Sequence, residues 1–513
     1  MTASTLVRPT LVSRSRSSAV ASAVASAIVG APTWTMSLAL GGFGTLVSLI
    51  AIGTPSFWGD EAASVLSAQR SLPSLFRMLG TVDAVHGSYY LFLHFWIRLF
   101  GTSEFAVRLP SAIAIGFVVA GVFLIGRQLS TRRVAIIAAL ICSVLPRIES
   151  IGGQARSYAI STAIAVWLTI LLVRFVERQT TSRLAWFGYA AGLAVGVYAF
   201  LYLGLLVAVH GAYLILRRQS SRVRRRWLQS VAAAVILTGP LLYSGYAERT
   251  QIAFLAHRNY AKFTLIMTNQ WFGTPLFATA AWIAIALAVA GIVLTMRRRA
   301  IVDRVAPLAI VWFVLPTAVL LMVNLVTPSY NLRYLSMSAP AAALLIALGI
   351  VSLRRRWLIA AATVAVMALA LPADIQERSP YAMDGGSDWR QASAYVAAHS
   401  EPGDAVLFDE TVRPSRLPRL AMRMYPGDYA GLTDVELVKP YDQTSGLWDV
   451  QAPLDTVAPK LATTKRVLLL EIRGSHDHGT RVDVTTLENL GFTLQHTETI
   501  HRTVVYILTR GTA

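Results

Sequence analysis

Residues 35–62 read TMSLALGGFGTLVSLIAIGTPSFWGDEA, a long apolar stretch that ends shortly before two adjacent acids, Asp60 and Glu61. A helix needs about 20 mostly apolar residues to cross a bilayer, so residues 35–54 are predicted to span a membrane. Ionisable groups close to a bilayer are costly, and they indicate a functional site by default. The acidic pair is therefore the first candidate site of this chain.

The composition is that of an integral membrane protein. Of the 513 residues, 55% are hydrophobic and only 14% are charged, and the mean hydropathy is +0.54. A soluble domain could not bury so much apolar surface. The net charge of +19 does not indicate nucleic-acid binding, because the basic residues are clustered between apolar stretches. The single cysteine, Cys142, excludes an intramolecular disulfide.

The apolar stretches predict a polytopic α-helical membrane protein with about eleven transmembrane helices. The predicted membrane domain covers residues 35–372, and a short N-terminal arm at residues 1–34 precedes it. The predicted spans are residues 35–54, 107–126, 133–148, 156–175, 184–201, 203–216, 228–246, 276–296, 305–326, 334–353 and 357–372.

The arginine clusters predict the orientation of these spans. When eleven spans alternate, every cluster falls on one side of the membrane, which the positive-inside rule makes the cytoplasmic side. The N-terminus is then cytoplasmic, and the chain is a multi-pass protein of the plasma membrane. Residues 55–106 form a long outer loop that carries the acidic pair. The clusters lie at residues 8–16, 127–133, 174–183, 217–226, 297–304 and 354–356.

A change of composition predicts a small extracytoplasmic α/β domain at residues 373–513. Residues 1–372 contain 32 Lys and Arg against 8 Asp and Glu, whereas the rest of the chain contains 14 against 19. A helix is expected from Asp388-Trp389-Arg390 to about His399. The sequence leaves open whether this domain holds the acceptor, holds a partner or only covers the site. Strands are expected at residues 405–408, 466–472, 493–499 and 503–509.

Several motifs in residues 35–372 resemble the GT-C superfamily of membrane glycosyltransferases, in particular the bacterial branch related to protein O-mannosyltransferases and lipid A aminoarabinose transferases. The resemblance implies transfer of a sugar from a polyprenyl-phosphate donor at the outer face, with inversion at the anomeric carbon. It also implies that the first acid of the pair, Asp60, is the catalytic base. The matching motifs are Asp60-Glu61, Asp83-x-x-His86 with Tyr89-Tyr90, Gly101-x-Ser103-Glu104-x-x-x-Arg108, Gln154-Ala155-Arg156-Ser157-Tyr158 and Arg333-Tyr334.

The residue types suit this chemistry. An attacking hydroxyl needs a positioned general base, and an oxocarbenium-like transition state is stabilised by a nearby anion. The departing phosphate needs cations, preferably arginine, which can bind two oxygens at once. We therefore predict Asp60 and Glu61 as the catalytic pair. The predicted donor-phosphate ligands are Arg156, Arg333 and His86, and the predicted pocket residues are Asp83, Tyr89, Tyr158 and Tyr334.

Structural alternatives exist for the central residues. Asp60 could cap a helix that starts at Ala62, since aspartate is a preferred N-cap. Glu61 could serve only to orient Asp60 or to pair with a base. Arg156 could pair with Glu149 instead of a phosphate.

The remaining residues have alternatives of the same kind. Arg333 could anchor its helix at the membrane interface, and Asp83 could be an ordinary turn residue. The predicted mechanism requires no cofactor. A divalent metal remains an alternative, for which Asp60, Glu61 and His86 would be the ligands, although the sequence contains no compact metal-binding motif.

The sequence thus predicts a polyprenyl-phosphate-sugar-dependent glycosyltransferase. Mannose is the expected sugar, and the acceptor is expected to be a cell-envelope glycolipid, a polysaccharide or a protein. Arabinofuranosyl transfer from polyprenyl-phosphate arabinose is the alternative within this class. A lipid or glycan transporter or flippase is the alternative from another class, although we find no internal repeat of the kind common in transporters. The expected partners are the donor, the acceptor and the bilayer, without nucleic acid.

Overall fold

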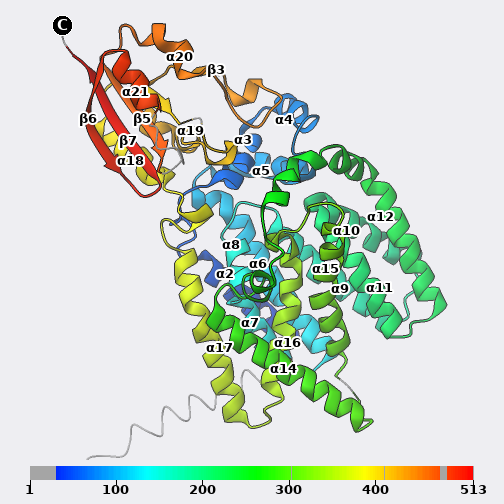
Figure 1. The fold of residues 1–513 in the computed structure, drawn as a ribbon. Coiled ribbons are helices and arrows are strands. Elements are labelled where there is room, and N and C mark those ends of the chain that lie inside the picture. The colour runs from blue at the N-terminus through cyan, green and yellow to red at the C-terminus, as the bar shows by residue number, and fades with distance from the viewer. Residues whose placement is uncertain (1–30, 302, 410, 474–481, 512–513) are drawn as a thin grey trace, which may run out of the picture.

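The computed structural model describes residues 31–301, 303–409, 411–473 and 482–511. It consists of a helical body and a C-terminal α/β domain, and three short helices lie between them (Figure 1). This is the fold class that the composition and the apolar stretches predict. The predicted N-terminal arm, residues 1–34, lies almost entirely outside the described residues.

Each of the eleven predicted apolar stretches contains a helix. Local capping sets several of the starts: the Ser103 hydroxyl accepts a hydrogen bond from the Ala106 N–H, and Thr131 does the same for Val134. The helices of the body are α2 (Thr33–Leu49), α6 (Glu104–Leu129), α7 (Arg132–Ser143), α8 (Pro146–Gly152), α9 (Tyr158–Glu177), α10 (Arg183–Ala199), η2 (Leu201–Leu205), α11 (Leu206–Leu216), α12 (Ser221–Ala247), α14 (Pro275–Arg297), α15 (Val305–Asn324), η4 (Leu332–Ser338), α16 (Ala339–Val351) and α17 (Arg356–Glu377).

Seven helices among the described residues are long and apolar enough to cross a membrane: α6, α9, α12, α14, α15, the continuous η4–α16 and α17. The pair α7 and α8, bent by 55°, would make an eighth. The helices α2 and α10 have 17 residues each and fall just short of this length. Eleven crossings therefore stay a prediction, although all eleven stretches are helical. The last helix, α17, continues to Glu377, past the expected end of its span.

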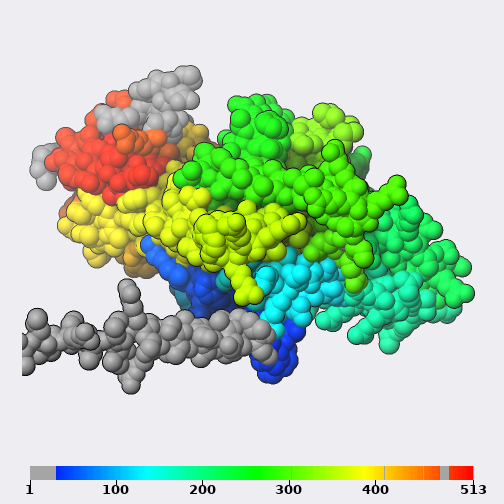
Figure 2. Space-filling model, turned by 90° about the horizontal axis from the view of Figure 1, so that it is seen from below, coloured from blue at the N-terminus to red at the C-terminus, as the bar shows by residue number. Residues whose placement is uncertain are grey.

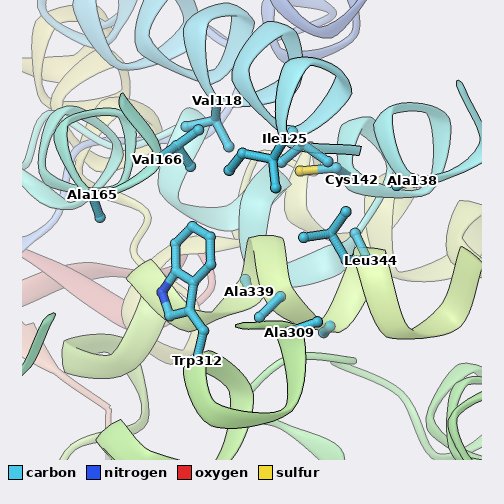
Figure 3. Packing of buried hydrophobic residues seen from close by; sticks show 14 of the residues in the cluster. Val118, Ile125, Ala138, Cys142, Ala165, Val166, Ala309, Trp312, Ala339 and Leu344 are labelled. Atoms are coloured by element: carbon cyan, nitrogen blue, oxygen red, sulfur yellow. The ribbon is translucent and has the colours of Figure 1, made fainter. Parts of the chain in front are cut away.

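The core of the body lies between α6, α7, α9, α15 and α16. Figure 3 shows Trp312 of α15 pointing toward residues of α6 and α9, among them Val118 and Val166. Cys142 lies on α7 beside Ile125 in the same cluster and is fully buried. This apolar core holds the ends of α8, α9 and η4 in constant relative positions, and those ends carry predicted site residues.

Four short elements connect α2 to α6 at one end of the body: α3 (Gly59–Gln69), α4 (Leu72–Leu79), η1 (Ala84–His86) and α5 (Gly87–Phe100). The Ser71 hydroxyl caps the start of α4 by accepting a hydrogen bond from the Ser74 N–H. Its Leu75 and Met78 are buried against α3 and α5, whereas Phe76 is exposed. With only 14 residues, α5 is shorter than a membrane span.

The C-terminal domain is built on a five-stranded sheet in the order β2-β1-β5-β7-β6. The strands β2, β1 and β5 are parallel, and β5, β7 and β6 are antiparallel. The four strands predicted from sequence are β1, β5, β6 and β7, and the predicted helix is α18. The bounds are α18 (Trp389–His399), β1 (Ala405–Phe408), η6 (Pro414–Arg416), α19 (Arg419–Met424), η7 (Pro426–Tyr429), β2 (Thr433–Asp434), β3 (Leu437–Lys439), η8 (Tyr441–Gln443), β4 (Val450–Gln451), α20 (Leu454–Val457), η9 (Ala458–Leu461), β5 (Arg466–Ile472), α21 (Val482–Asn489), β6 (Phe492–Thr499) and β7 (Thr503–Arg510).

The C-terminal domain lies over one side of the body. In the view from below in Figure 2, the red atoms near the C-terminal end of the chain lie at one edge of the molecule. In Figure 1 the elements α3, α4 and α5 lie between this domain and the long helices. Residues 57–107, which contain the acidic pair, are thus placed between the two parts of the molecule.

Candidate active site

Asp60 lies in the first turn of α3 and faces a cation from the body. The Nη1 atom of Arg333, in η4, is 3.1 Å from Asp60 Oδ2, and both side chains are a little over one quarter exposed. The predicted alternative, that Asp60 caps a helix, is wrong: the cap residue of α3 is Trp58, and it makes no side-chain cap bond. The carboxylate of Asp60 is therefore available to a ligand on its exposed side.

Arg156 joins Asp60 to the turn that carries His86. Its Nη1 donates to the Asp60 carbonyl and to the Ser64 hydroxyl, each at 3.2 Å, and its Nη2 lies 3.2 Å from His86 Nε2. The alternative pairing with Glu149 does not occur, because Glu149 pairs with Arg378 at 2.6 Å. Arg156 thus belongs to the same cluster as the acid, and its role as a phosphate ligand stays a prediction.

The charges of this cluster act on one another. Burial acts to raise the pKa of the Asp60 carboxyl, but the charges of Arg333 and Arg156 outweigh it and hold the pKa below its usual value. Burial and the Arg156 charge lower the pKa of His86 to about 4. His86 is therefore neutral near pH 7, so its Nε2 can accept the hydrogen bond from Arg156. Two guanidinium charges then face a single carboxylate.

Aromatic rings border the cluster. The Arg333 guanidinium lies over the Trp58 ring, with 5.0 Å to the ring centroid, and Arg156 lies 6.0 Å from that of Tyr158. Tyr334 stacks on Tyr202 at 4.5 Å. Cation–π contacts of this kind orient a guanidinium while leaving its N–H groups free for an anion. The predicted pocket residues Tyr158 and Tyr334 are thus beside the cations.

Tyr89 and Asp83 are placed differently. Tyr89 is buried, and among the described residues its hydroxyl has no hydrogen-bond partner. Asp83 has a positive φ of 58° and accepts a hydrogen bond from the Tyr90 hydroxyl at 2.7 Å. The structure therefore gives Asp83 the contacts of a turn residue, whereas Tyr89 presents an unsatisfied polar atom.

Glu61 points away from Asp60, because consecutive residues of a helix diverge by about 100°. Both of its oxygens bind Arg108, at 2.8 Å and 2.6 Å, and its Oε1 also accepts from the Ala155 N–H at 2.9 Å. Arg108 also donates to the backbone carbonyls of residues 52, 55 and 56. Both side chains are fully buried. Glu61 is thus engaged in structural contacts, and we propose for it a role in stability.

The alternative metal set does not form, because Glu61 is engaged by Arg108 and faces away from Asp60 and His86. Within the ranges that the structure describes, no group of three or more His, Cys, Asp or Glu side chains could hold a metal ion. Asp60 and His86 are instead linked through Arg156.

Sequence reasoning missed several neighbours of the acid. Trp58 directly precedes the acidic pair, and an aromatic residue in that position could have been noticed. Tyr202 lies at the junction of two predicted spans, and Ser64 lies one turn after Asp60 in the sequence. No local signal identifies Tyr202 or Ser64, because tertiary packing brings Tyr202 to Tyr334 and the guanidinium of Arg156 to Ser64.

Comparisons with known proteins concern the fold of the chain. The family model described as dolichyl-phosphate-mannose-protein mannosyltransferase matches residues 88–243. No curated protein matches the chain. Among solved structures, the chain is similar to ArnT from Cupriavidus metallidurans bound to undecaprenyl phosphate, with a TM-score of 0.56 and 13% identity over 93% of this chain and 98% of that chain.

Two further structures are similar. ArnT from Cupriavidus metallidurans in the apo state gives a TM-score of 0.54 with 12% identity, over 91% of this chain and 97% of that chain. The arabinofuranosyltransferase AftD from Mycobacteria gives 0.48 with 15% identity, over 92% of this chain and 40% of that chain. At 12% and 13% identity, the likeness to the two ArnT structures concerns the fold alone.

The apolar helices and the likeness to ArnT therefore define a multi-pass membrane protein with the fold of ArnT. In fold, the chain resembles the GT-C superfamily of membrane glycosyltransferases. Within it, residues 88–243 are similar to the dolichyl-phosphate-mannose-protein mannosyltransferases, and the whole chain has the fold of ArnT.

Proposed function

We propose that this protein transfers a sugar, with inversion, from a polyprenyl-phosphate donor to a hydroxyl acceptor at the outer face of the plasma membrane. The observation that carries the proposal is the cluster of Asp60 with Arg333 and Arg156 at one end of the helical body. It combines a carboxylate with two guanidinium groups, which are the base and the phosphate ligands that such a transfer needs. The undecaprenyl phosphate bound to ArnT supports a donor of this lipid class.

The chemistry follows from the positions of these groups. The acceptor oxygen attacks the anomeric carbon and passes its proton to the Asp60 carboxylate. The bond between that carbon and the phosphate oxygen breaks, and the polyprenyl phosphate leaves with the bonding electrons. Arg156 and Arg333 stabilise the charge that develops on the phosphate. The proton then passes from Asp60 to water, and the acid is ready for another turnover.

The proposal also gives a role to the ion pair that Asp60 forms with Arg333 before the donor binds. In the free protein, Arg333 lowers the pKa of Asp60 and so weakens it as a base. A donor phosphate that binds Arg333 neutralises part of this charge, and the pKa of Asp60 then rises toward its usual value. Asp60 thus becomes a better proton acceptor only when the donor is present.

We further propose mannose as the sugar, with arabinofuranose as the alternative, and a glycolipid, polysaccharide or protein of the cell envelope as the acceptor. The match of residues 88–243 to a mannosyltransferase family supports mannose. The predicted topology, with a cytoplasmic N-terminus and an external C-terminal domain, places Asp60 at the outer face, where such acceptors lie.

The test is sugar transfer by membranes that contain the protein, supplied in parallel with radiolabelled polyprenyl-phosphate mannose and polyprenyl-phosphate arabinose. Asp60→Asn removes the base and preserves the size of the side chain. Glu401→Gln is the matched acid-to-amide control, since Glu401 is largely exposed in the C-terminal domain. Transfer from one donor that is lost in Asp60→Asn and kept in Glu401→Gln supports the proposal and identifies the sugar. Transfer that persists in Asp60→Asn contradicts it.

A further inference from the structure

We propose that the C-terminal domain positions the catalytic acid, by holding the segment of residues 53–57 that leads into Asp60. The inference rests on the proposed function for the role of Asp60, but the contacts that carry it are independent of the sugar. It assigns Arg390 and Tyr425 as positioning residues, although they lie more than 300 residues from the segment in the sequence.

Arg390, the second residue of α18, binds the beginning of this segment. Its Nη2 donates to the Gly53 carbonyl at 2.6 Å, and its Nη1 donates to the Thr54 carbonyl at 2.9 Å. Its Nε donates to Glu104 Oε1 at 3.0 Å, and its own N–H donates to the Ser56 hydroxyl at 3.1 Å. One side chain of the C-terminal domain thus joins the segment to the start of α6.

Phe57 is held on both of its backbone polar groups. The Ser387 hydroxyl donates to the Phe57 carbonyl at 2.6 Å, and the Phe57 N–H donates to the Tyr425 hydroxyl oxygen at 3.2 Å. That hydroxyl donates in turn to Glu104, the same carboxylate that Arg390 binds. Phe57 is three residues before Asp60, so these bonds restrict the chain immediately before the catalytic turn.

A close approach at Gly59 brings the C-terminal domain to the residue next to Asp60. A Cβ atom added to Gly59 would lie 2.1 Å from the carbonyl oxygen of Ser415, in η6. Asp384 holds η6 in this place, since Arg413 and Arg416 both pair with its carboxylate. Backbone therefore packs directly on backbone at this point, which only glycine permits.

Apolar packing supports the same contact. Trp389, which is fully buried, and Leu420 and Ala421 of α19 belong to one cluster with residues of α3 and α5, including Val65 and Leu93. The C-terminal domain and the helices around the acid therefore share a core. A domain that only covered the site would not need to bind the backbone of residues 53–57 at each of these points.

The experiment compares Arg390→Ala and Arg390→Lys with Arg466→Ala in the purified full chain. Arg466 pairs with Glu401 and Asp404 inside the C-terminal domain, so its removal also breaks an ion pair in this domain. Two quantities are measured: kcat and donor KM, and hydrogen exchange of peptides covering residues 52–62. Since a misplacement of about 1 Å can cost about 10²-fold in rate, kcat should fall by about that factor in Arg390→Ala.

The full expected result is a loss of kcat with little change of donor KM, partial rescue by lysine, and faster exchange at residues 53–57. Arg466→Ala should resemble the wild type in both quantities. Wild-type kcat and unchanged exchange in Arg390→Ala would overturn the inference. If Arg390→Ala does not fold, Tyr425→Phe replaces it, because this variant removes one hydroxyl and keeps the ring beside Phe57. Unchanged exchange and unchanged kcat in Tyr425→Phe would likewise overturn the inference.

Failure of the proposed function gives a different pattern. A wild-type protein that transfers neither sugar would refute that function, while the exchange measurement would still decide the inference about positioning. Faster exchange at residues 53–57 in Arg390→Ala, without this change in Arg466→Ala, would then support the contact. Equal exchange in all variants would overturn it.

Discussion

Glu61 and Asp60 are adjacent acids, and the structure predicts opposite consequences when each is replaced by its amide. Glu61 is fully buried and receives three hydrogen bonds, two from Arg108 and one from the Ala155 N–H. In Glu61→Gln, an amide N–H₂ faces a guanidinium N–H, and the Arg108 charge loses its partner. Removing one partner of a buried ion pair costs about 3–5 kcal/mol, and we expect a loss of this size in the free energy of unfolding.

Asp60→Asn is the matched comparison. The Asp60–Arg333 pair is partly exposed to solvent, so its loss should change the free energy of unfolding by about 1 kcal/mol or less. Turnover should instead fall by about 10²–10⁴-fold, the usual contribution of a general base. Glu61→Gln should keep turnover per folded molecule much closer to the wild type.

The assay is reversible unfolding in mixed micelles with a denaturing detergent, followed by tryptophan fluorescence, together with turnover of the folded fraction. The reasoning would be refuted by a Glu61→Gln protein as stable as the wild type that has lost turnover. That result would return Glu61 to the chemistry, as the sequence first suggested, and would make the pairing with Arg108 incidental.

Two further predictions concern protonation and packing. The pKa of the His86 imidazole is about 4 in the folded protein, against an ordinary value of 6.5. Between pH 6.5 and pH 4 the unfolded chain therefore binds a proton at His86 that the folded protein does not bind. The free energy of unfolding should fall as the pH decreases through this range. Since Asp60 stays ionised below its usual pKa, kcat/KM should show no acid limb near pH 6.5, and a limb there would contradict this account. In Gly59→Ala the new methyl group meets the Ser415 backbone, so both kcat and the thermal midpoint should fall, at a cost of about 1–3 kcal/mol. Gly42→Ala, whose Cβ would meet nothing within 4 Å, is the control, and equal behaviour of the two variants would argue against the contact.

The sequence by itself predicts the helices of the body, the strands of the C-terminal domain and several candidate site residues. The length and apolarity of the stretches indicate helices in a membrane, because hydrophobic length is a local property. Short apolar runs likewise predict four strands of the C-terminal domain, at residues 405–408, 466–472, 493–499 and 503–509. The acidic pair and the arginines at 156 and 333 stood out because charges are rare in such a sequence.

Only the tertiary structure decides which partners these side chains contact. Asp60 and Glu61 are neighbours in the sequence, but the turn of α3 directs one to Arg333 and the other to Arg108. The positions of Arg390 and Tyr425 at the segment before Asp60 depend on folding a distant domain back onto the body. No local pattern encodes such contacts, because they arise from packing between elements that lie hundreds of residues apart.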